Sequence, residues 1–412
     1  MAEILHVSPV MPVDEHHIEY ALDRAGHSGA LVTSWVPTAL EHGLFRLLPF
    51  FRRRMRREPV RLRQRDVCRH TWPDMRHFFD QALAAYSSVL LAHDDFFSRV
   101  DRRAAARIDK KTGAVVGREF GCLQTFRRAS ALGIPRVYHL PTVHHQALKG
   151  ILELENEAYP GVCRSTFDTG EFEKHRLDNK LEELELSDLI VCPSNFVRGT
   201  MLEAGVPEKK IRVIPFGCES SWLSENRKAS RKTFLFAGNI SARKGAHRLI
   251  QVWKQLEAYK THRLLMVGDM HLSPTFLKDY KGVFEHIPRM PREDLRELYL
   301  SADAFVLPAL AEGFALVILE ALSCGTPVIA SRNSGAEGFL ADGDTALLHD
   351  AQDNESLLRV LERALTQPDE LRAIGERGRA KALAWPWRLF EEKIMAAISS
   401  VLHDEGPNAS VK

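Results

Sequence analysis

The stretch EGFALVILEALSCGTPVIAS, residues 312–331, decides the fold class of this chain. It follows an apolar run at 304–308 that is typical of a buried strand. Gly313 ends the loop after that run, and residues 314–323 are good helix formers. The apolar residues at 327–330 then predict a further strand. A strand, a helix and a second strand in this order indicate a parallel α/β sheet.

A helix that begins after Gly313 leaves free backbone N–H groups beside the carboxylate of Glu312, and together these form a cradle for an anion. Glu320 lies eight residues after Glu312, which on a helix is about 12 Å of rise. The two carboxylates are therefore expected to bind one elongated ligand. A nucleotide sugar has this shape, with hydroxyls at both ends and a diphosphate between them. The alternative is that Glu320 is an ordinary glutamate on a helix face.

A second informative stretch is FLFAGNISARKG, residues 234–245. A strand opens into a turn at Gly238 and Asn239, and Arg243 and Lys244 come directly before a helical pattern. Two cations at a helix N-terminus can neutralise a diphosphate. The stretch lacks the G-x-x-x-x-G-K-[ST] pattern of a P-loop. The alternative is a solvated Arg-Lys pair.

Strand-like runs alternate with helical patterns along the whole chain, which indicates parallel α/β sheets throughout. The pattern stops in the polar segment PFGCESSWLSENRKASRKT, residues 215–233, and then starts again. This predicts two domains, 1–217 and 218–384, followed by a crossing helix and tail at 385–412. The expected strands lie at 4–7, 30–36, 89–93, 136–140, 189–192, 211–215, 234–237, 264–267, 284–287, 304–308, 327–330 and 346–348.

The composition excludes several classes of protein. The formal net charge is only +2, so the chain as a whole has no field that favours nucleic acid. The 6 cysteines are scattered without a C-x-x-C pair, so neither a disulfide framework nor a zinc site is expected. The chain shows neither a signal-peptide pattern nor an apolar run of membrane-spanning length. A cytoplasmic protein is therefore expected.

One region is strongly basic. Residues 46–76 contain 11 arginines and three acids, interleaved with apolar side chains. The favoured interpretation is a solvated Arg-rich helix, and the alternative is peripheral contact with an anionic membrane, at the inner face, through the part between Arg46 and Arg65. Nucleic acid is not expected as a partner, because no aromatic platform accompanies the charge.

The stretch at 312–331 resembles retaining GT-B glycosyltransferases of family 4, the glycosyl transferases group 1, whose signature is E-x7-E. Glu312 and Glu320 match both glutamates of that signature, and Lys244 with Gly245 matches the family's diphosphate-binding Lys-Gly pair. The family usually has an arginine where this chain has Asn239, and Arg243 is expected to replace it. The resemblance spans about 187–402.

This resemblance implies a GT-B fold, in which two Rossmann-like parallel-sheet domains face a cleft and a C-terminal helix crosses back to the first domain. It implies that the second domain binds the donor and that Glu312 and His144 act in catalysis. The residues implied for donor binding are Gly238, Asn239, Arg243, Lys244, Gly313, Phe314, Ala315, Leu316 and Glu320.

The first 180 residues match the family less well. The family commonly has a Gly-Gly loop after its first strand, whereas this chain has SPVMPVDEHH at 8–17. Family members also have an active-site histidine near the cleft. TVH at 142–144 resembles that pattern, so His144 is preferred, and His139 and His145 are acceptor-side or second-choice candidates. The alternative is that these histidines are ordinary polar residues on a loop or strand end.

The resemblance implies a retaining hexosyltransferase that moves a sugar from a nucleoside diphosphate sugar to a sugar or lipid-linked acceptor, in the synthesis of cell-surface polysaccharide, exopolysaccharide or glycolipid. No metal or other cofactor is expected, since cations and helix N-termini can neutralise the leaving diphosphate. The alternatives are an epimerase or phosphorylase of the same fold, and a non-catalytic nucleotide-sugar or membrane-associated binding module.

Overall fold

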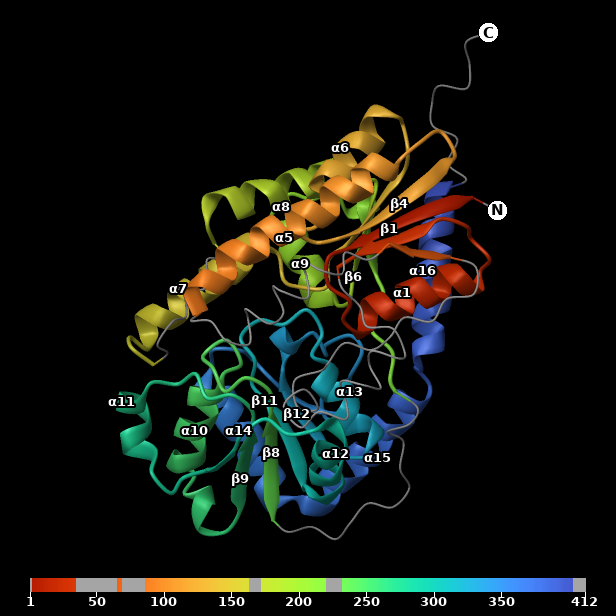
Figure 1. Ribbon diagram of the computed structural model, residues 1–412. Coiled ribbons are helices and arrows are strands. Elements are labelled where there is room, and N and C mark those ends of the chain that lie inside the picture. Colours follow the sequence, from red (N-terminus) through yellow and green to blue (C-terminus); the bar gives the residue numbers. More distant parts are fainter. Residues whose placement is uncertain (1, 35–64, 69–85, 163–171, 220–231, 403–412) are drawn as a thin grey trace, which may run out of the picture.

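The structure is a computed structural model that describes residues 2–34, 65–68, 86–162, 172–219 and 232–402. It has two parallel sheets, each flanked by helices, and Figure 1 shows them as two separate layered units. The predicted fold of two Rossmann-like α/β domains is therefore confirmed.

The first sheet has seven parallel strands in the order β3-β2-β1-β4-β5-β6-β7. These are β1 (Glu3–Ser8), β2 (Ala30–Thr33), β3 (Asp66–Cys68), β4 (Thr112–Arg118), β5 (Arg136–His139), β6 (Leu189–Cys192) and β7 (Ile211–Val213). The second sheet has six parallel strands in the order β10-β9-β8-β11-β12-β13. These are β8 (Thr233–Ala237), β9 (Arg263–Val267), β10 (Glu285–Ile287), β11 (Ala304–Leu307), β12 (Val328–Ser331) and β13 (Leu347–His349).

Helices connect the strands and cover both sheets. Those of the first domain are α1 (Val13–Arg24), α5 (Tyr86–Arg107), α6 (Leu123–Ala131), α7 (His145–Ala158), α8 (Lys174–Leu186) and α9 (Asn195–Glu203). The others are α10 (Ala246–Gln255), α11 (Pro274–Leu277), α12 (Arg292–Ser301), α13 (Leu316–Ser323), α14 (Asn354–Thr366), α15 (Pro368–Leu383) and α16 (Trp387–Leu402).

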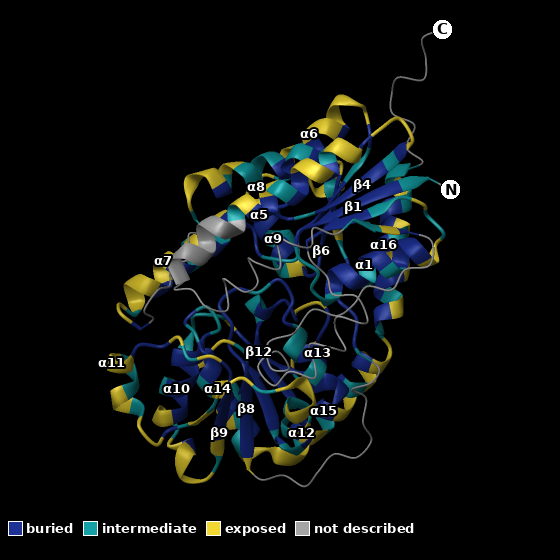
Figure 2. Cartoon of the chain, in the orientation of Figure 1, coloured by how far each residue is buried: buried dark blue, intermediate teal, exposed yellow. Residues whose placement is uncertain are grey.

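The strands in the middle of each sheet are buried on both faces, as Figure 2 shows. All four residues of β6 and all four of β11 are buried. Parallel sheets with helices on both faces require such continuous apolar runs. For this reason, most strands could be predicted from short Val-, Ile- and Leu-rich stretches of the sequence.

The order of strands places a switch point in each sheet, where the connections begin to run in the opposite direction. In the first sheet it lies between β1 and β4, and in the second between β8 and β11. Ligands of open α/β sheets bind beyond the carboxyl ends of the strands at such points. The loops after β8 and β11 are the two stretches that the sequence singled out.

Three predictions about the first domain were wrong. Residues 89–93, expected as a strand, lie in helix α5, because a short apolar run does not distinguish a strand from part of a helix. Strand β4 was missed, since two of its seven residues are glycine and one is arginine. Strand β3 was missed as well, and it places part of the Arg-rich region in the sheet instead of in a solvated helix.

The predicted membrane-contacting stretch lies outside the described residues except for Arg65. The side chain of Arg65 is fully buried and pairs with Glu19, so it is unable to contact a membrane surface. Its inclusion in that stretch was wrong. In the described part of the chain, no helix has both the length and the apolar character needed to cross a bilayer.

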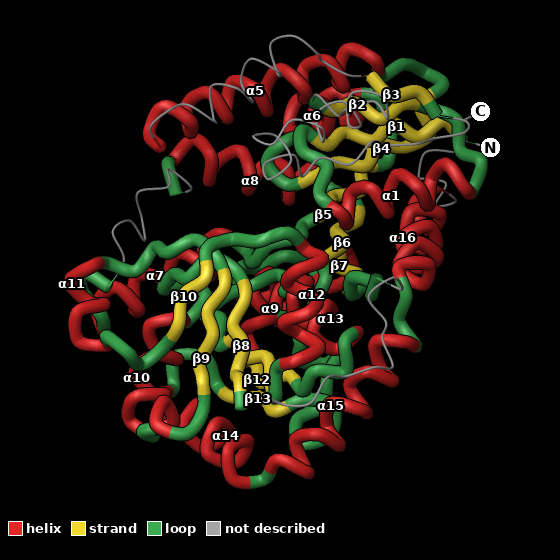
Figure 3. Tube along the Cα trace, turned by 60° about the horizontal axis from the view of Figure 1, so that its bottom comes forward, coloured by secondary structure: helices red, strands yellow, loops and turns green. Residues whose placement is uncertain are grey.

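The C-terminal helix crosses back to the first domain, as predicted. Figure 3 shows α16 beside α1. The ring of His17 stacks on Trp387 with centroids 4.2 Å apart, and its Nδ1 lies 2.8 Å from Oε1 of Glu391. Arg24 also pairs with Glu391.

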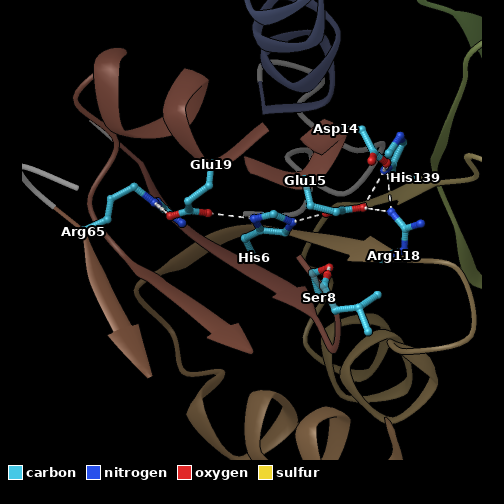
Figure 4. A network of polar contacts seen from close by, with 9 residues as sticks. His6, Ser8, Asp14, Glu15, Glu19, Arg65, Arg118 and His139 are labelled. Atoms are coloured by element: carbon cyan, nitrogen blue, oxygen red, sulfur yellow. Dashed lines mark hydrogen bonds and ion pairs between the residues drawn. The ribbon is translucent and has the colours of Figure 1, made fainter. Parts of the chain in front are cut away.

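A buried polar network joins the strands of the first domain to α1, and Figure 4 shows its members in one line. His6 on β1 lies between two carboxylates of α1, with its ring nitrogens 2.8 Å from Glu15 and 2.7 Å from Glu19. At one end Arg65 binds Glu19 and donates to the carbonyl oxygen of Ile4 at 2.9 Å. Arg65, directly before β3, therefore links the start of β3 to β1 through this hydrogen bond.

At the other end of the network, Arg118 of β4 donates to Asp14 at 2.9 Å and to Glu15 at 2.7 Å. His139 of β5 lies 2.7 Å from the same Glu15. Three strands, β1, β4 and β5, are thereby joined to helix α1 through the buried carboxylate of Glu15.

This network sets the charge of His6. Burial alone lowers the pKa of His6, but hydrogen bonds and the charges of Glu15 and Glu19 outweigh it and raise the pKa to about 9. His6 is therefore protonated at neutral pH, which balances the two carboxylates.

We expect the free energy of unfolding to fall as the pH rises from 6.5 towards 9. A group whose pKa is raised on folding stabilises the protein fully below its unfolded pKa of 6.5, and this is lost as the pH passes its folded value of about 9. The total effect is on the order of 3 kcal/mol. Urea unfolding between about pH 6.5 and 8.5 measures it. Glu19→Gln removes one of the two charges and should flatten the dependence, and a wild-type protein equally stable across this range would contradict the assignment.

Candidate functional site

The loops after β8 and β11 are hydrogen-bonded to each other at the switch point of the second sheet. The N–H of Leu310 donates to the carbonyl oxygen of Arg243 at 2.8 Å, and Nε of Arg243 donates to the carbonyl oxygen of Ala311 at 3.1 Å. The two stretches that the sequence singled out are therefore adjacent in space.

Between these loops lies an ion pair. Nζ of Lys244 is 2.9 Å from Oε1 of Glu312, and Nε of Arg243 is 3.6 Å from the same oxygen. Burial raises the pKa of Glu312, but the charges of Lys244 and Arg243 outweigh this and lower the pKa below its usual value. Glu312 is thus ionised at neutral pH, and the two cations face this single carboxylate.

Glycine is required at the start of α10. Gly245 has φ +66°, and a Cβ there would lie 1.9 Å from the carbonyl oxygen of Pro308, at the end of β11. The absence of a side chain lets the N-terminus of α10 approach the strand end. Lys244 is thereby brought to Glu312.

The loop between β11 and α13 differs in one respect from the prediction. The helix begins at Leu316, and Glu312 lies in the loop before it. The rise of 12 Å between Glu312 and Glu320, which assumed helix throughout, therefore does not apply. The N–H of Ala315 also donates to the carbonyl oxygen of Ser334 at 3.2 Å and is not free for an anion. The first turn of α13, which has no preceding helical carbonyls, remains as the donor of N–H groups.

The other implied donor-binding residues lie around these loops. Gly238 is partly exposed and Asn239 is exposed at the end of β8, and Leu316 is partly exposed in the first turn of α13. Phe314 is 5% exposed, with its ring 5.5 Å from that of Phe339. Its side chain therefore belongs to the core.

Glu320 lies on α13 and is paired with α12. Oε1 is 2.6 Å from the guanidinium of Arg292, and the hydroxyl of Tyr299 donates to Oε2 at 3.4 Å. Burial raises the pKa of Glu320, and the Arg292 charge offsets this only in part. Because the Arg292 side chain is 55% exposed, its guanidinium stays solvated when an incoming hydroxyl replaces it at Glu320.

The first domain meets the site at Gly313. A Cβ at this position would lie 1.8 Å from the carbonyl oxygen of Pro141, in the loop after β5. The hydroxyl of Ser194, which caps α9, donates to the carbonyl oxygen of Gly313 at 2.6 Å. The loop that carries Glu312 is therefore in direct contact with the first domain.

His144 and His145 follow that contact at the start of α7. His144 is the N-cap residue, and the two rings lie 4.3 Å apart. Burial lowers the pKa of His144, and burial together with His144 lowers the pKa of His145 to about 4. Nδ1 of His144 and Nε2 of His145 are buried and have no hydrogen-bond partner among the residues that the structure describes. Two neutral imidazoles with unsatisfied nitrogens are suited to bind hydroxyl groups.

His139 has a different environment. It belongs to the buried network with Glu15, where its Nδ1 is occupied. Asp14, Glu15 and His139 also offer three ligand atoms within 4.8 Å of one another, the geometry of a possible metal site. Arg118, however, already donates to both carboxylates, so its charge opposes a cation there.

Residues that the sequence did not single out complete this side of the site. Glu119, after the missed strand β4, accepts a hydrogen bond from Thr142 and lies 2.9 Å from Nζ of Lys180. Glu183 of α8 accepts the N–H of Phe120 at 2.7 Å and thereby fixes the same turn. The valine pair of GAVVGREFG was the signal that could have located Glu119.

Residues 222–381 match the family Glycosyl transferases group 1. This matched segment lies in the second domain and contains Lys244, Glu312 and Glu320. The roles of these residues are not established by the match.

Over 241 residues the chain is 28% identical to D-inositol 3-phosphate glycosyltransferase from Segniliparus rotundus, covering 52% of this chain and 54% of that protein. The chain thus spans about half the length of this curated relative. Sucrose-phosphate synthase from Thermosynechococcus elongatus has a TM-score of 0.64 at 17% identity, over 97% of this chain and 99% of its own. Anabaena HepE in complex with UDP-glucose has a TM-score of 0.59 at 14% identity, over 97% and 100%. These two likenesses show that the chain has the GT-B fold.

We expect Lys244→Ala to weaken the binding of a nucleoside diphosphate about tenfold to a hundredfold. One charge-assisted contact in a partly enclosed site is worth about 1.5 to 3 kcal/mol. Calorimetric titration with UDP, GDP and ADP measures the loss. Lys254→Ala is the control, because this lysine lies in the last turn of α10, the helix that follows Lys244, and donates to the carbonyl oxygen of Asp279. Equal affinities of Lys244→Ala and wild type would contradict the assignment.

Proposed function

We propose that the protein is a retaining glycosyltransferase that moves a hexosyl group from a nucleoside diphosphate sugar to an acceptor hydroxyl. The observation that carries the proposal is the ion pair of Lys244 with Glu312. It joins two stretches that resemble donor-binding motifs, and it lies where the loop of Gly313 contacts the first domain. The match of residues 222–381 to the group 1 family supports the same assignment.

The proposed donor binds mainly to the second domain. Lys244 and Arg243 bind the diphosphate, together with N–H groups in the first turn of α13. In this scheme the diphosphate takes over from Glu312 as the anion that faces the two cations. Glu312 then interacts with hydroxyls of the transferred sugar, and Glu320 binds the ribose. The UDP-glucose complex of a protein with this fold supports a nucleotide sugar as donor.

The proposed reaction is a displacement on one face of the sugar. The bond from the anomeric carbon to the diphosphate oxygen breaks as the acceptor oxygen forms its own bond to that carbon. The acceptor proton passes to an oxygen of the leaving diphosphate. Lys244 and Arg243 stabilise the charge that grows on the diphosphate, and electrostatic stabilisation of this kind is usually the largest catalytic contribution.

His144 is proposed to bind a sugar or acceptor hydroxyl. Its support is the unpartnered, buried Nδ1 beside the contact between the domains. His145 offers a second such nitrogen, whereas the Nδ1 of His139 is occupied by Glu15. The preference for His144 over the other two therefore stays a prediction with structural support.

We further propose that the reaction needs no metal, because two cations and a helix N-terminus already face the diphosphate. A sugar or lipid-linked acceptor, a role in surface polysaccharide or glycolipid synthesis, and a cytoplasmic location at or near the membrane stay predictions. No disulfide joins the five described cysteines, which fits a reducing compartment.

The proposal is tested by incubating the protein with UDP-, GDP- and ADP-sugars in the presence of EDTA and measuring slow donor hydrolysis. A transferase releases sugar and nucleoside diphosphate, and an epimerase releases a second sugar nucleotide. A binding module is stabilised by the nucleotide, with a higher melting temperature, but turns nothing over. Either of the last two results would reject the proposed function.

The two glutamates are expected to have separable effects. Glu312→Gln should lower kcat more than it raises KM, since it removes a negative charge that favours positive charge on the sugar in the transition state. Glu320→Gln should weaken the free nucleotide and the intact donor alike, because the ribose is common to both. Calorimetry with the nucleoside diphosphate alone discriminates between them. Weaker binding by Glu312→Gln and unchanged binding by Glu320→Gln would reverse the assignment.

A further inference from the structure

The C-terminal half of α7, a helix of the first domain, reaches the second domain. In Figures 1 and 3 this helix lies towards α10 and α11. Its Glu155 side chain is 1% exposed although it is charged. Oε1 accepts hydrogen bonds from Nε2 of His247 at 2.6 Å and from Nε of Arg248 at 2.7 Å. Both donors lie in the first turn of α10.

The second carboxylate oxygen is also fully used. Oε2 of Glu155 accepts from Arg248 at 2.7 Å and from the side-chain amide of Gln352 at 3.1 Å. Arg248 is itself fixed by the carbonyl oxygen of Gln352 at 2.8 Å and by Oδ1 of Asn354 at 2.9 Å. We name Glu155, His247, Arg248 and Gln352 the Glu155 cluster.

Further contacts extend the cluster along α7. The ring of Tyr159 lies 4.7 Å from the guanidinium carbon of Arg248, and its hydroxyl accepts a hydrogen bond from Asn354 at 3.0 Å. The N–H of Ser273 donates to the carbonyl oxygen of Val162 at 2.8 Å. The end of α7 and the turn after it therefore pack as part of the second domain's surface.

The charges make this contact specific. Burial raises the pKa of Glu155, but hydrogen bonds from His247 and Arg248 outweigh this and lower the pKa to about 2. Loss of either partner while the domains stay packed would leave the other charge buried and unpaired, which is costly. The bidentate geometry with Arg248 also fixes the orientation of the two helices.

The two ends of α7 contact different parts of the candidate site. Its N-cap is His144, beside the loop of Gly313. About 17 Å further along, Glu155 contacts the first turn of α10, which begins two residues after Lys244. A continuous helix thereby connects the acceptor-side histidine with the helix that follows the diphosphate-binding cations.

We propose that Glu155 is a positioning residue, which fixes the placement of Arg243 and Lys244 relative to His144 across the two domains. The inference rests on the proposed function, in which donor and acceptor bind to different domains. Under the proposed function, a nucleoside diphosphate binds to the second domain alone. Transfer also requires that the first domain hold the acceptor in the correct position relative to the donor. A small misplacement of reacting groups lowers the rate strongly while leaving such binding intact.

The test compares Glu155→Gln with Glu153→Gln. Glu153 lies on the same helix with a 51% exposed side chain near Lys149, so its variant is the matched control. In Glu155→Gln the dissociation constant of UDP, GDP or ADP, whichever binds wild type, should stay within about threefold, and kcat for transfer or donor hydrolysis should fall at least tenfold. In Glu153→Gln both should equal wild type. Unchanged kcat, or an equal loss of binding and turnover, in Glu155→Gln would overturn the inference.

A second variant tests the same inference in case Glu155→Gln does not fold. Arg248→Lys keeps the charge but loses the bidentate contact, so it should lower kcat in the same direction. The double variant with Glu155→Gln should be no slower than the slower single one, because the two residues act as one unit. Additive losses would overturn the inference.

Hydrogen exchange separates this inference from the proposed function. Amides of residues 246–249 should exchange faster in Glu155→Gln than in Glu153→Gln, while those of β8 and β9 should not change. Equal exchange in both variants would overturn the inference whatever the activity. A wild-type protein that turns over no donor would reject the proposed function, and faster exchange in Glu155→Gln would still support the link between the domains.

Discussion

The arrangement of this molecule depends on the close approach of Gly313 to the carbonyl oxygen of Pro141. A Cβ at position 313 would lie 1.8 Å from that oxygen, so only glycine permits the contact. The loop after β11 of one sheet thereby rests on the loop after β5 of the other, and the carboxyl edges of the two sheets face each other. Since open α/β sheets bind their ligands at these edges, the two binding edges share one site. Glu312 and His144 lie on opposite sides of this contact.

The charges on the two sides are organised differently. In the second domain, Lys244 and Arg243 face Glu312 in partly exposed positions, where another anion can compete for the cations. In the first domain, Glu15 is fully buried between His6, Arg118 and His139. An interaction of this kind is costly to break and is suited to a fixed framework. The first network therefore keeps the sheet edge rigid, whereas the second site can exchange partners.

The sequence predicted the second domain well because its strands are short, continuous apolar runs and its motifs lie at strand ends. Helix α16 was also predicted, within the segment 385–412, and its apolar residues recur at helical spacing. Strand β4 was missed because glycine and arginine interrupt its apolar residues, and the contribution of Glu119 and Lys180 to the candidate site was missed with it. The pairing of Glu155 with Arg248 could not be predicted either, because the two residues are 93 positions apart and neither belongs to a motif. Sequence patterns report local periodicity, whereas a buried ion pair between domains depends on the tertiary arrangement.

The two domains are joined on both sides of the contact at Gly313. On one side the linker runs beside the start of α16, where the N–H of Cys218 donates to the carbonyl oxygen of Trp385 at 2.9 Å and the indole of Trp385 donates to that of Pro215 at 3.2 Å. On the other side lies the Glu155 cluster, and Figure 1 shows α16 and α7 at opposite edges of the molecule. Both covalent crossings lie on the α16 side, so a rotation of the domains about the linker would separate them most at α7. Such a rotation would break charged hydrogen bonds of Glu155 before it strained the chain. The contacts of Glu155 therefore oppose such a rotation at the side of the molecule where no chain crossing does.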